Sequence, residues 1–506
     1  MSNEMSQEIG MRNGIQGNLL QISQALSRAR TQAQQNVCFR GVSTDSRQIQ
    51  PGQLFVALRG EKFDGHAYVA DVLARGAVAV IIDEQGAADW HAQGVRIQPA
   101  LIVPDTKIAL GELARAWRSQ FALPVIGVTG SNGKTTVKEM LASILAAEFG
   151  EAQRLATQGN LNNEIGVPLT LFRLHARQRA AVIELGMNHP GEITWLAEIA
   201  QPTVALVNNA QREHQEFMAT VEAVARENGA VLSQLGAQGV AVFPAADEFT
   251  LLWQSLAGAA KCRTFALMED GARCQVKPDV LGNTHATAQG QTLRCNFAGH
   301  SLSIELQVSG VHNARNALAA LTAAWAAGCS PAAIQFGLEN FQAVKGRLQR
   351  HVIRTGERES LLIDDTYNAN PDSVRAAIDV LASLPAPQVL VLGDMGEVGD
   401  QGPVFHAEVG AYAKQQGIGQ LLCLGEQSLA AVEAFGGFGA GAQHFADIDT
   451  LIVATQSIRA TASSTLVKGS RFMRMERVVA AYLAADVLVP TVAPTDSEKK
   501  EIPHAA

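Results

Sequence analysis

The residues best suited to chemistry are Gly133, Lys134 and Thr135, at the end of a glycine-rich segment. The segment reads Val125-Ile-Gly-Val-Thr-Gly-Ser-Asn-Gly-Lys-Thr-Thr136 and joins an apolar run to a helical pattern. A strand, a glycine loop, Lys-Thr and a helix are together typical of a nucleotide phosphate loop. Glycines let backbone N–H groups approach the phosphates, and the helix N-terminus adds partial positive charge. Lys134 is then expected to neutralise the β- and γ-phosphates, and the Thr135 hydroxyl to bind Mg²⁺.

The glycine spacing of this segment departs from the usual phosphate loop. The usual loop has a glycine five residues before Gly133, where this chain has Val128. The pattern here is G-x-x-G-x-x-G-K-T, and a glycine-rich turn that binds no ligand is the alternative interpretation. We expect seven residues to bind the nucleotide: Gly130, Ser131, Asn132, Gly133, Lys134, Thr135 and Thr136.

Length and composition indicate a globular protein of several domains. A chain of 506 residues is too long for one core, so two to four domains are expected. The net charge of −8, from 40 Lys+Arg against 48 Asp+Glu, argues against a nucleic-acid partner. The six cysteines are scattered and form no C-x-x-C pair, which argues against a zinc or disulfide framework and favours a reducing compartment.

Neither a signal peptide nor a membrane span is expected. The first residues lack a charged stretch followed by an apolar core. No apolar run approaches the length that crosses a bilayer. These observations predict a cytoplasmic protein without a membrane partner, and we expect a monomer.

Apolar runs separated by helical patterns predict a parallel α/β organisation. Strands are expected at 54–58, 77–82, 180–184, 204–207, 240–243, 361–364, 389–392, 421–424 and 465–467. Helices are expected near 68–75, 108–117 and 314–327, and short antiparallel strands within 274–308. The chain is divided into domains at 17–105, 106–330 and 331–489, followed by a disordered tail at 490–506 that is rich in Pro, Lys and Glu.

Five polar segments, together with the glycine loop, resemble those of the Mur ligases, and most of all those of the MurF type. The segments are Gly159-Asn-Leu-Asn-Asn-Glu-Ile-Gly-Val-Pro168, Glu184-Leu-Gly-Met-Asn-His-Pro-Gly-Glu-Ile193, Gly310-Val-His-Asn-Ala-Arg-Asn316, Asp364-Asp-Thr-Tyr-Asn-Ala-Asn-Pro371 and Lys468-Gly-Ser-Arg471. The resemblance covers about residues 40 to 480. The segment that starts at Asp364 separates the MurF type from its relatives.

The resemblance implies an α/β fold with the three-domain Mur ligase architecture. The N-terminal domain would bind a UDP-sugar, the central P-loop-type parallel sheet ATP and Mg²⁺, and a C-terminal Rossmann-like domain a dipeptide. The implied reaction is ATP-dependent ligation of D-alanyl-D-alanine to UDP-N-acetylmuramoyl-tripeptide through an acyl phosphate, in peptidoglycan precursor synthesis. Closure of the domains would exclude water from that intermediate. The alternatives are another Mur ligase or a folylpolyglutamate synthase, which adds one amino acid, and a non-catalytic nucleotide-dependent module.

The resemblance also implies roles for individual residues. Catalytic roles fall on Lys134, Glu184, His214 and Arg347, and metal ligation on Thr135, Glu184 and His214. Asn313 would bind the adenine, Asp365 the ribose and Arg347 the γ-phosphate side. The residues expected to bind the other substrates are Ser43, Thr44, Asp45, Ser46, Arg47, Asn162, Asn163, Asn368 and Asn370. Residues 58–66 would complete the UDP-sugar pocket.

Asn228 stands where most Mur ligases carry a lysine whose carbamate holds a second Mg²⁺. An amide forms no carbamate, although its carbonyl can bind a hard cation. We therefore expect a carbamate-free enzyme whose second metal depends on His214, phosphate oxygens and water. The neighbours Arg226 and Glu227 are the residues that would compensate for the missing charge.

Overall fold

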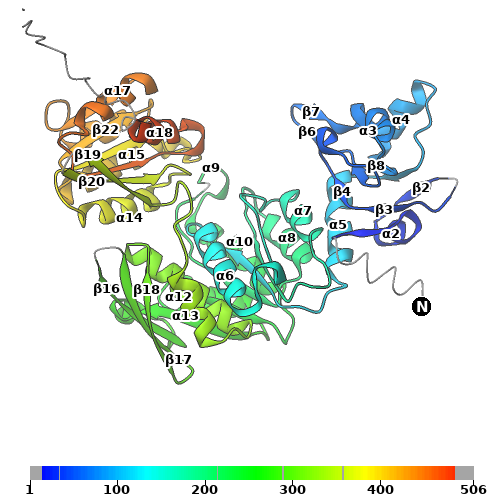
Figure 1. The fold of residues 1–506 in the computed structure, drawn as a ribbon, viewed down its shortest axis with the longest axis horizontal. Helices are drawn as coiled ribbons and strands as arrows, with labels where there is room; N and C mark the ends of the chain where they lie inside the picture. The colour runs from blue at the N-terminus through cyan, green and yellow to red at the C-terminus, as the bar shows by residue number, and fades with distance from the viewer. Residues whose placement is uncertain (1–13, 34, 214, 288–289, 356–357, 485–506) are drawn as a thin grey trace, which may run out of the picture. The chain divides into compact units, whose positions relative to one another are not determined.

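The computed structural model describes residues 14–33, 35–213, 215–287, 290–355 and 358–484. Two compact units make up the chain (Figure 1). The first contains the residues up to Val344 together with Glu397–Asp400, and the second contains Lys345–Gly396 and the residues from Gln401 onward. Each unit is built on its own sheets.

The first unit begins with a five-stranded sheet in the order β2-β9-β8-β5-β4. The strands are β2 (Arg30–Gln32), β9 (Ala100–Val103), β8 (Ala79–Asp83), β5 (Leu54–Val56) and β4 (Val42–Ser43). All neighbours are parallel except β2 and β9. Its two faces are covered by α3 (Val69–Ala74) with α4 (Glu84–Ala92), and by α2 (Leu19–Ala25) with α5 (Thr106–Arg118). Two short hairpins complete this part, β1 (Gln16–Asn18) with β3 (Cys38–Arg40), and β6 (Arg59–Gly60) with β7 (Phe63–Asp64).

A nine-stranded sheet forms the rest of the first unit, in the order β11-β12-β10-β13-β14-β15-β16-β17-β18. Its parallel strands are β11 (Arg154–Ala156), β12 (Ala180–Glu184), β10 (Val125–Thr129), β13 (Val204–Val207), β14 (Val240–Pro244), β15 (Lys261–Leu267) and β16 (Val280–Ala286). The predicted antiparallel extension is confirmed by β17 (Gln291–Phe297) and β18 (His300–Leu306).

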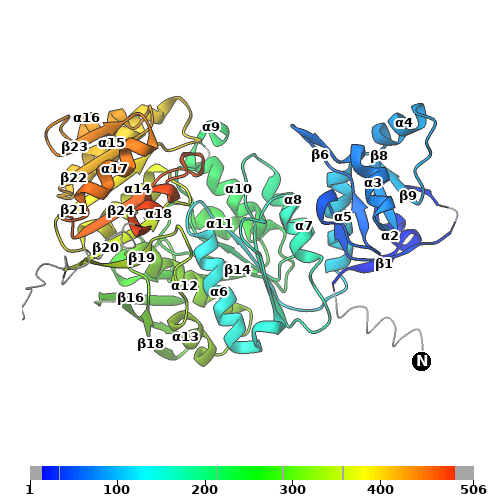
Figure 2. The ribbon, with the colours of Figure 1, turned by 45° about the horizontal axis from the view of Figure 1, so that its top comes forward.

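Helices cover both faces of the central sheet (Figure 2). One face packs against α6 (Lys134–Phe149), α12 (Val311–Ala326) and α13 (Pro331–Glu339). The other packs against α5, α7 (Gly166–Leu171), α8 (Glu192–Ala200), α10 (Val221–Ser233) and α11 (Thr250–Leu256), while α9 (Gln215–Met218) is a single turn. The apolar spacing of α6 puts Met140, Ile144 and Leu145 fully in the core, where they hold the helix against the sheet.

The second unit contains a six-stranded sheet in the order β19-β20-β24-β21-β22-β23. The strands are β19 (Gln349–Thr355), β20 (Arg358–Asp365), β24 (Ser464–Lys468), β21 (Gln388–Gly393), β22 (Gln420–Leu424) and β23 (Ala442–Phe445), and only β19 runs antiparallel. One face is covered by α17 (Ile448–Ile458) and α18 (Glu476–Ala484). A second group of helices, α14 (Pro371–Ala382), α15 (Gly402–Gln415) and α16 (Leu429–Phe435), contacts β21, β22 and β24.

The predicted α/β class is confirmed, with one helix displaced. The helix expected at 314–327 begins three residues earlier, at Val311, because Gly310 has a φ of 97° and ends the preceding extended segment. No helix of the described residues is long and apolar enough to cross a membrane. The predicted tail at 490–506 lies outside the described residues, and the domain boundaries stay predictions.

Candidate active site

The glycine loop lies between β10 and α6, at the carboxyl end of a fully buried strand. Lys134 and Thr135 are the first two residues of α6. Gly133 has a φ of 82°, and a Cβ there would lie 2.5 Å from Oδ1 of Asn316. Only glycine therefore fits this position without strain. The loop has the strand-to-helix geometry that presents backbone N–H groups to an anion.

Lys134 folds back over the loop that precedes it. Its Nζ donates to the carbonyl oxygens of Gly130 and Ser131, the latter at 3.2 Å. It also forms an ion pair at 3.2 Å with Oε2 of Glu213, and its side chain is 15% exposed. The ammonium is thus held at the loop and remains partly accessible.

Glu184 ends β12 and lies beside the glycine loop, because Val128 and Glu184 are partners in the sheet. Its Oε1 accepts hydrogen bonds from Thr135 Oγ1 at 3.1 Å and from Asn162 Nδ2 at 2.9 Å. Oε2 is buried and has no hydrogen-bond partner. A buried carboxylate oxygen without a partner, next to a hydroxyl, fits a hard divalent cation.

The metal prediction therefore concerns two described residues, Thr135 and Glu184. Within the described ranges, no group of three or more His, Cys, Asp or Glu could hold a metal ion. The third predicted ligand, His214, lies outside the described residues. Asn163 accepts from the N–H of Gly166 at 2.9 Å, at the start of α7, and so supports the segment that carries Asn162.

A chain of side-chain amides braces the loop, and it was not predicted as part of the site. The backbone N–H of Asn132 donates to Asn209 Oδ1 at 2.9 Å. Its carbonyl oxygen accepts from Asn208 Nδ2 at 2.8 Å, and Asn208 Nδ2 also donates to Asn316 Oδ1 at 2.8 Å. Asn316 then donates to Asn313 Oδ1 at 3.3 Å. The predicted adenine residue is thereby connected to the phosphate loop.

The remaining loop residues are held by the segment after β13. Ser131 Oγ accepts from the N–H of Gln211 at 2.8 Å, and Asn132 Nδ2 donates to Gln211 Oε1 at 2.6 Å. Thr136 is half-buried in the first turn of α6.

Asn313 is the third residue of α12, and its Nδ2 donates to the carbonyl of Ser309 at 2.8 Å. The cap of this helix is Gly310.

In the second unit, Asp365 is buried at the end of β20 and paired with Lys468. Lys468 Nζ lies 2.6 Å from Asp365 Oδ2 and 2.9 Å from the carbonyl of Asn368. The N–H of Leu348 donates to Asp365 Oδ1 at 3.1 Å. Burial raises the pKa of Asp365, and Lys468 opposes that shift. Asp365 and Lys468 both lie in segments that resemble the Mur ligases, but the sequence does not show that they pair.

Arg347, Asn368 and Asn370 are also engaged within the second unit. The Arg347 guanidinium lies 4.0 Å from the ring centroid of Tyr367, a cation–π contact. Asn368 Oδ1 accepts from the next N–H in the chain at 2.9 Å. Asn370 is the N-cap of α14 and accepts from the N–H of Ser373 at 2.8 Å. Their predicted contacts with ATP and with a dipeptide stay predictions.

The predicted UDP-sugar segment forms a tight turn after β4. Asp45 Oδ1 accepts from the N–H and Nε of Arg47, both at 2.9 Å. These hydrogen bonds lower the pKa of Asp45 to about 2. Ser43 Oγ accepts from the N–H of Asp45 at 3.2 Å, and Thr44 between them is half-buried. Arg75, not predicted, donates to the carbonyls of Ser46 at 2.7 Å and Arg47 at 3.0 Å.

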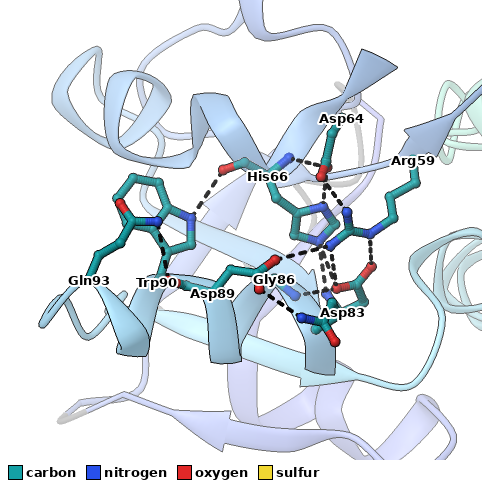
Figure 3. Close-up of polar contacts among 9 residues, drawn as sticks. Arg59, Asp64, His66, Asp83, Gly86, Asp89, Trp90 and Gln93 are labelled. Carbon is teal, nitrogen blue, oxygen red and sulfur yellow. Dashed lines mark hydrogen bonds and ion pairs between the residues drawn. The ribbon is translucent and has the colours of Figure 1, made fainter. Parts of the chain in front are cut away.

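A polar cluster anchors the neighbouring hairpin, as Figure 3 shows. Arg59 pairs with Asp83 at 2.7 Å and contacts Asp64. The buried ring of His66 contacts Asp64 through Nδ1 at 2.6 Å and accepts from the N–H of Asp83 at Nε2, at 3.0 Å. Trp90 Nε1 donates to the carbonyl of His66 at 3.1 Å. These side chains fasten the 58–66 segment to β8 and α4.

The residues flanking Asn228 do not reach the glycine loop through their described contacts. Arg226 pairs with Glu222 at 2.7 Å. Glu227 accepts from the N–H groups of Gly191 at 2.9 Å and Ile193 at 2.8 Å. Arg226 and Glu227 therefore contact other parts of the unit, and the compensation expected from them stays a prediction.

A phosphate loop with an acidic residue at the end of the adjacent strand defines a nucleotide-binding class of protein, and comparison with known sequences gives the family. Residues 128–324 match the Mur ligase middle domain, residues 346–471 the Mur ligase, glutamate ligase domain, and residues 39–118 the Mur ligase family, catalytic domain. The chain belongs to the Mur ligase family. The three matches confirm the predicted three-domain architecture.

Relatives of the MurF type match nearly the whole chain. The UDP-N-acetylmuramoyl-tripeptide--D-alanyl-D-alanine ligase of Escherichia coli (strain K12) is 41% identical, over 88% of this chain and 94% of its own length. The Haemophilus influenzae ligase of the same name is 37% identical, over 91% and 97%. A crystal structure of MurF from Acinetobacter baumannii superposes with a TM-score of 0.82 at 34% identity, covering 93% of this chain and 99% of that one.

Proposed function

We propose that the protein joins D-alanyl-D-alanine to UDP-N-acetylmuramoyl-tripeptide at the expense of ATP, in peptidoglycan precursor synthesis. The observation that carries the chemistry is the group formed by Lys134, Thr135 and Glu184, with one Glu184 oxygen buried and unpartnered. The names of the curated relatives supply the two substrates. The family supplies the use of ATP.

The reaction has two steps. The terminal carboxylate of the tripeptide attacks the γ-phosphorus of ATP, so that ADP leaves and an acyl phosphate forms. The amine of the dipeptide then attacks the acyl carbon, phosphate leaves, an amide forms and the amine loses a proton. The Lys134 ammonium and the N–H groups at the start of α6 stabilise the charge on the phosphoryl group during transfer.

The residues around Glu184 also suit a magnesium ion. When bound, Mg²⁺ neutralises phosphate charge and polarises the phosphoryl oxygens. The Thr135 hydroxyl and the Glu184 carboxylate are the described groups that would hold it. The predicted role of His214 stays a prediction.

The binding roles of the other site residues are those that the family resemblance implies. The turn from Ser43 to Arg47 would bind the UDP-sugar, Asn313 the adenine and Asp365 the ribose, with Arg347 near the γ-phosphate. Asn368 and Asn370 would bind the dipeptide. A cytoplasmic location and a monomeric state complete the proposal.

Phosphate release from ATP tests this function directly. We expect release that requires both UDP-N-acetylmuramoyl-tripeptide and D-alanyl-D-alanine. Release with a single amino acid in place of the dipeptide would identify another Mur ligase activity or a folylpolyglutamate synthase activity. ATP binding without any release would identify a non-catalytic module.

A further inference from the structure

Asn228, a buried residue of α10, contacts the backbone of the phosphate loop. It is 1% exposed. Its Oδ1 accepts from the N–H of Gly130 at 2.8 Å, and its own carbonyl accepts from Thr129 Oγ1 at 3.0 Å. Its Nδ2 donates to Glu213 Oε1 at 3.3 Å. Because one end of the amide faces a donor and the other an acceptor, the amide has a single favourable orientation.

Glu213 connects Asn228 to the loop lysine. It is 7% exposed, and its second oxygen, Oε2, lies 3.2 Å from Lys134 Nζ. Lys134 Nζ in turn donates to the carbonyl of Gly130. The contacts therefore run from Gly130 to Asn228, to Glu213, to Lys134 and back to Gly130, and we name these four residues the loop ring.

A closed ring restrains the lysine in a way that a single ion pair does not. A lysine side chain has many rotamers, and ordering it costs conformational entropy. In the loop ring the ammonium is tied to the loop both directly and through two buried side chains. A charge that is already in place when phosphate arrives stabilises a transition state better than one that must be ordered during the reaction.

We propose that Glu213 and Asn228 are positioning residues for Lys134, which hold its ammonium at the loop before the nucleotide binds. This inference rests on the proposed binding of ATP at the loop. Both oxygens of Glu213 act as acceptors, so a glutamine there would turn an N–H₂ group toward either Lys134 or Asn228. The loop ring then opens while the size of the side chain is kept.

The test compares Glu213→Gln, Glu213→Asp and Asn228→Ala with the wild-type protein. Glu222→Gln is the matched control, because Glu222 is an exposed carboxylate on the same helix as Asn228. We measure kcat, the KM for each substrate, the equilibrium binding of ADP and the unfolding midpoint. Both Glu213 variants and Asn228→Ala are expected to lower kcat roughly tenfold, since small misplacements of a catalytic group cost factors of this size.

The expected pattern also includes constants that do not change. For Glu213→Gln, the KM for UDP-N-acetylmuramoyl-tripeptide and the Kd of ADP should stay within about threefold of the wild-type values. Its unfolding midpoint should stay within a few degrees of that of the wild type. Glu213→Asp keeps the charge but is one methylene shorter, so it should not restore kcat.

Three results would overturn the proposal. Tighter ADP binding with unchanged kcat would make Glu213 a competitor of the phosphates. Full activity of Glu213→Asp would mean that charge alone matters. A lower unfolding midpoint together with a higher KM for both substrates would mean that Glu213 has a structural role. Failure of the wild-type protein to bind ADP would instead refute the proposed function itself.

Discussion

Two lysine–carboxylate pairs lie at the carboxyl ends of the two large sheets, and their lysines differ in burial. Lys134 and Glu213 are 3.2 Å apart, and the lysine side chain is 15% exposed at the start of α6. Lys468 and Asp365 are 2.6 Å apart, and the lysine side chain is only 3% exposed at the end of β24. The first lysine otherwise contacts loop carbonyls, whereas the second is enclosed between a buried carboxylate and the carbonyl of Asn368.

The difference shows how burial decides what an ion pair does. A partly exposed ammonium can contact phosphate oxygens while its carboxylate still holds it in place, because part of its surface is open to solvent. Removing one member of a buried pair leaves an uncompensated charge in the interior. The Lys134 pair is therefore suited to receiving a ligand, and the Lys468 pair to holding β20 and β24 together.

The strongest test of this comparison is Lys134→Ala. We expect a loss of a hundredfold or more in kcat, because one preorganised charge at a phosphoryl group contributes several kcal/mol. The free energy of unfolding should fall less than in Lys468→Met, because Lys134 is 15% exposed and Glu213 keeps Asn228 Nδ2 as a donor. Lys261→Ala, at an exposed position of β15, is the control. Near-normal turnover of a folded Lys134→Ala protein would refute the assignment of the loop.

Lys468→Met provides the reverse test. Because it leaves Asp365 buried and unpaired, we expect the free energy of unfolding to fall by about 3 kcal/mol in denaturant titrations. The double variant Asp365→Asn with Lys468→Met should recover much of that loss. If the single variant were as stable as the wild type, the two pairs would not differ in the way proposed.

Arg47 and Asp45 form a third ion pair for this comparison, in which the Arg47 side chain is 86% exposed. Arg47→Ala should raise the KM for UDP-N-acetylmuramoyl-tripeptide about tenfold and leave that for ATP unchanged, because Arg47 is proposed to touch only the first ligand. The pKa of Asp45 is about 2, so any stability that its ionisation contributes is present above its usual pKa and lost as the pH falls toward 2. The effect of Arg47→Ala should therefore be constant from pH 6 to pH 9. An effect on ATP alone would place the sugar-nucleotide site elsewhere.

The smallest expected effect concerns dissolved carbon dioxide. Asn228 cannot form a carbamate, and its side-chain oxygen Oδ1 already accepts a hydrogen bond from the N–H of Gly130. We expect the ligation rate to be unchanged when bicarbonate is removed from the assay. A marked fall that added bicarbonate reverses would show that a lysine carbamate acts at this loop.

The fold could be predicted well where burial imposes a simple pattern. The apolar runs at 180–184 and 204–207 coincide with β12 and β13, because strands inside a parallel sheet are buried on both faces. The antiparallel strand β19 was missed, since Gln349–Thr355 carries polar residues at an edge of the sheet. Helix α12 was placed three residues late because polar residues occupy its first turn.

The site could be predicted only where one segment carries the chemistry. Lys134, Thr135 and Glu184 follow from local patterns and from the family resemblance. The roles of Glu213 and Asn316 depend on contacts between segments that are distant in sequence, and an amide or a carboxylate is too common to indicate them alone. Glu213 has one local signal in the sequence, its position next to the predicted metal ligand His214.

The chain of amides beside the phosphate loop also bears on how the protein is made. Its hydrogen bonds join residues that are 76 positions apart, from Asn132 to Asn208, and 108 positions apart, from Asn208 to Asn316. At usual rates of synthesis, Asn316 leaves the ribosome roughly 10 to 40 s after Asn132. The glycine segment therefore emerges early but gains its last brace only when α12 has been added. A nascent chain that ends before α12 contains every residue of the loop and lacks the support that gives the loop its final shape.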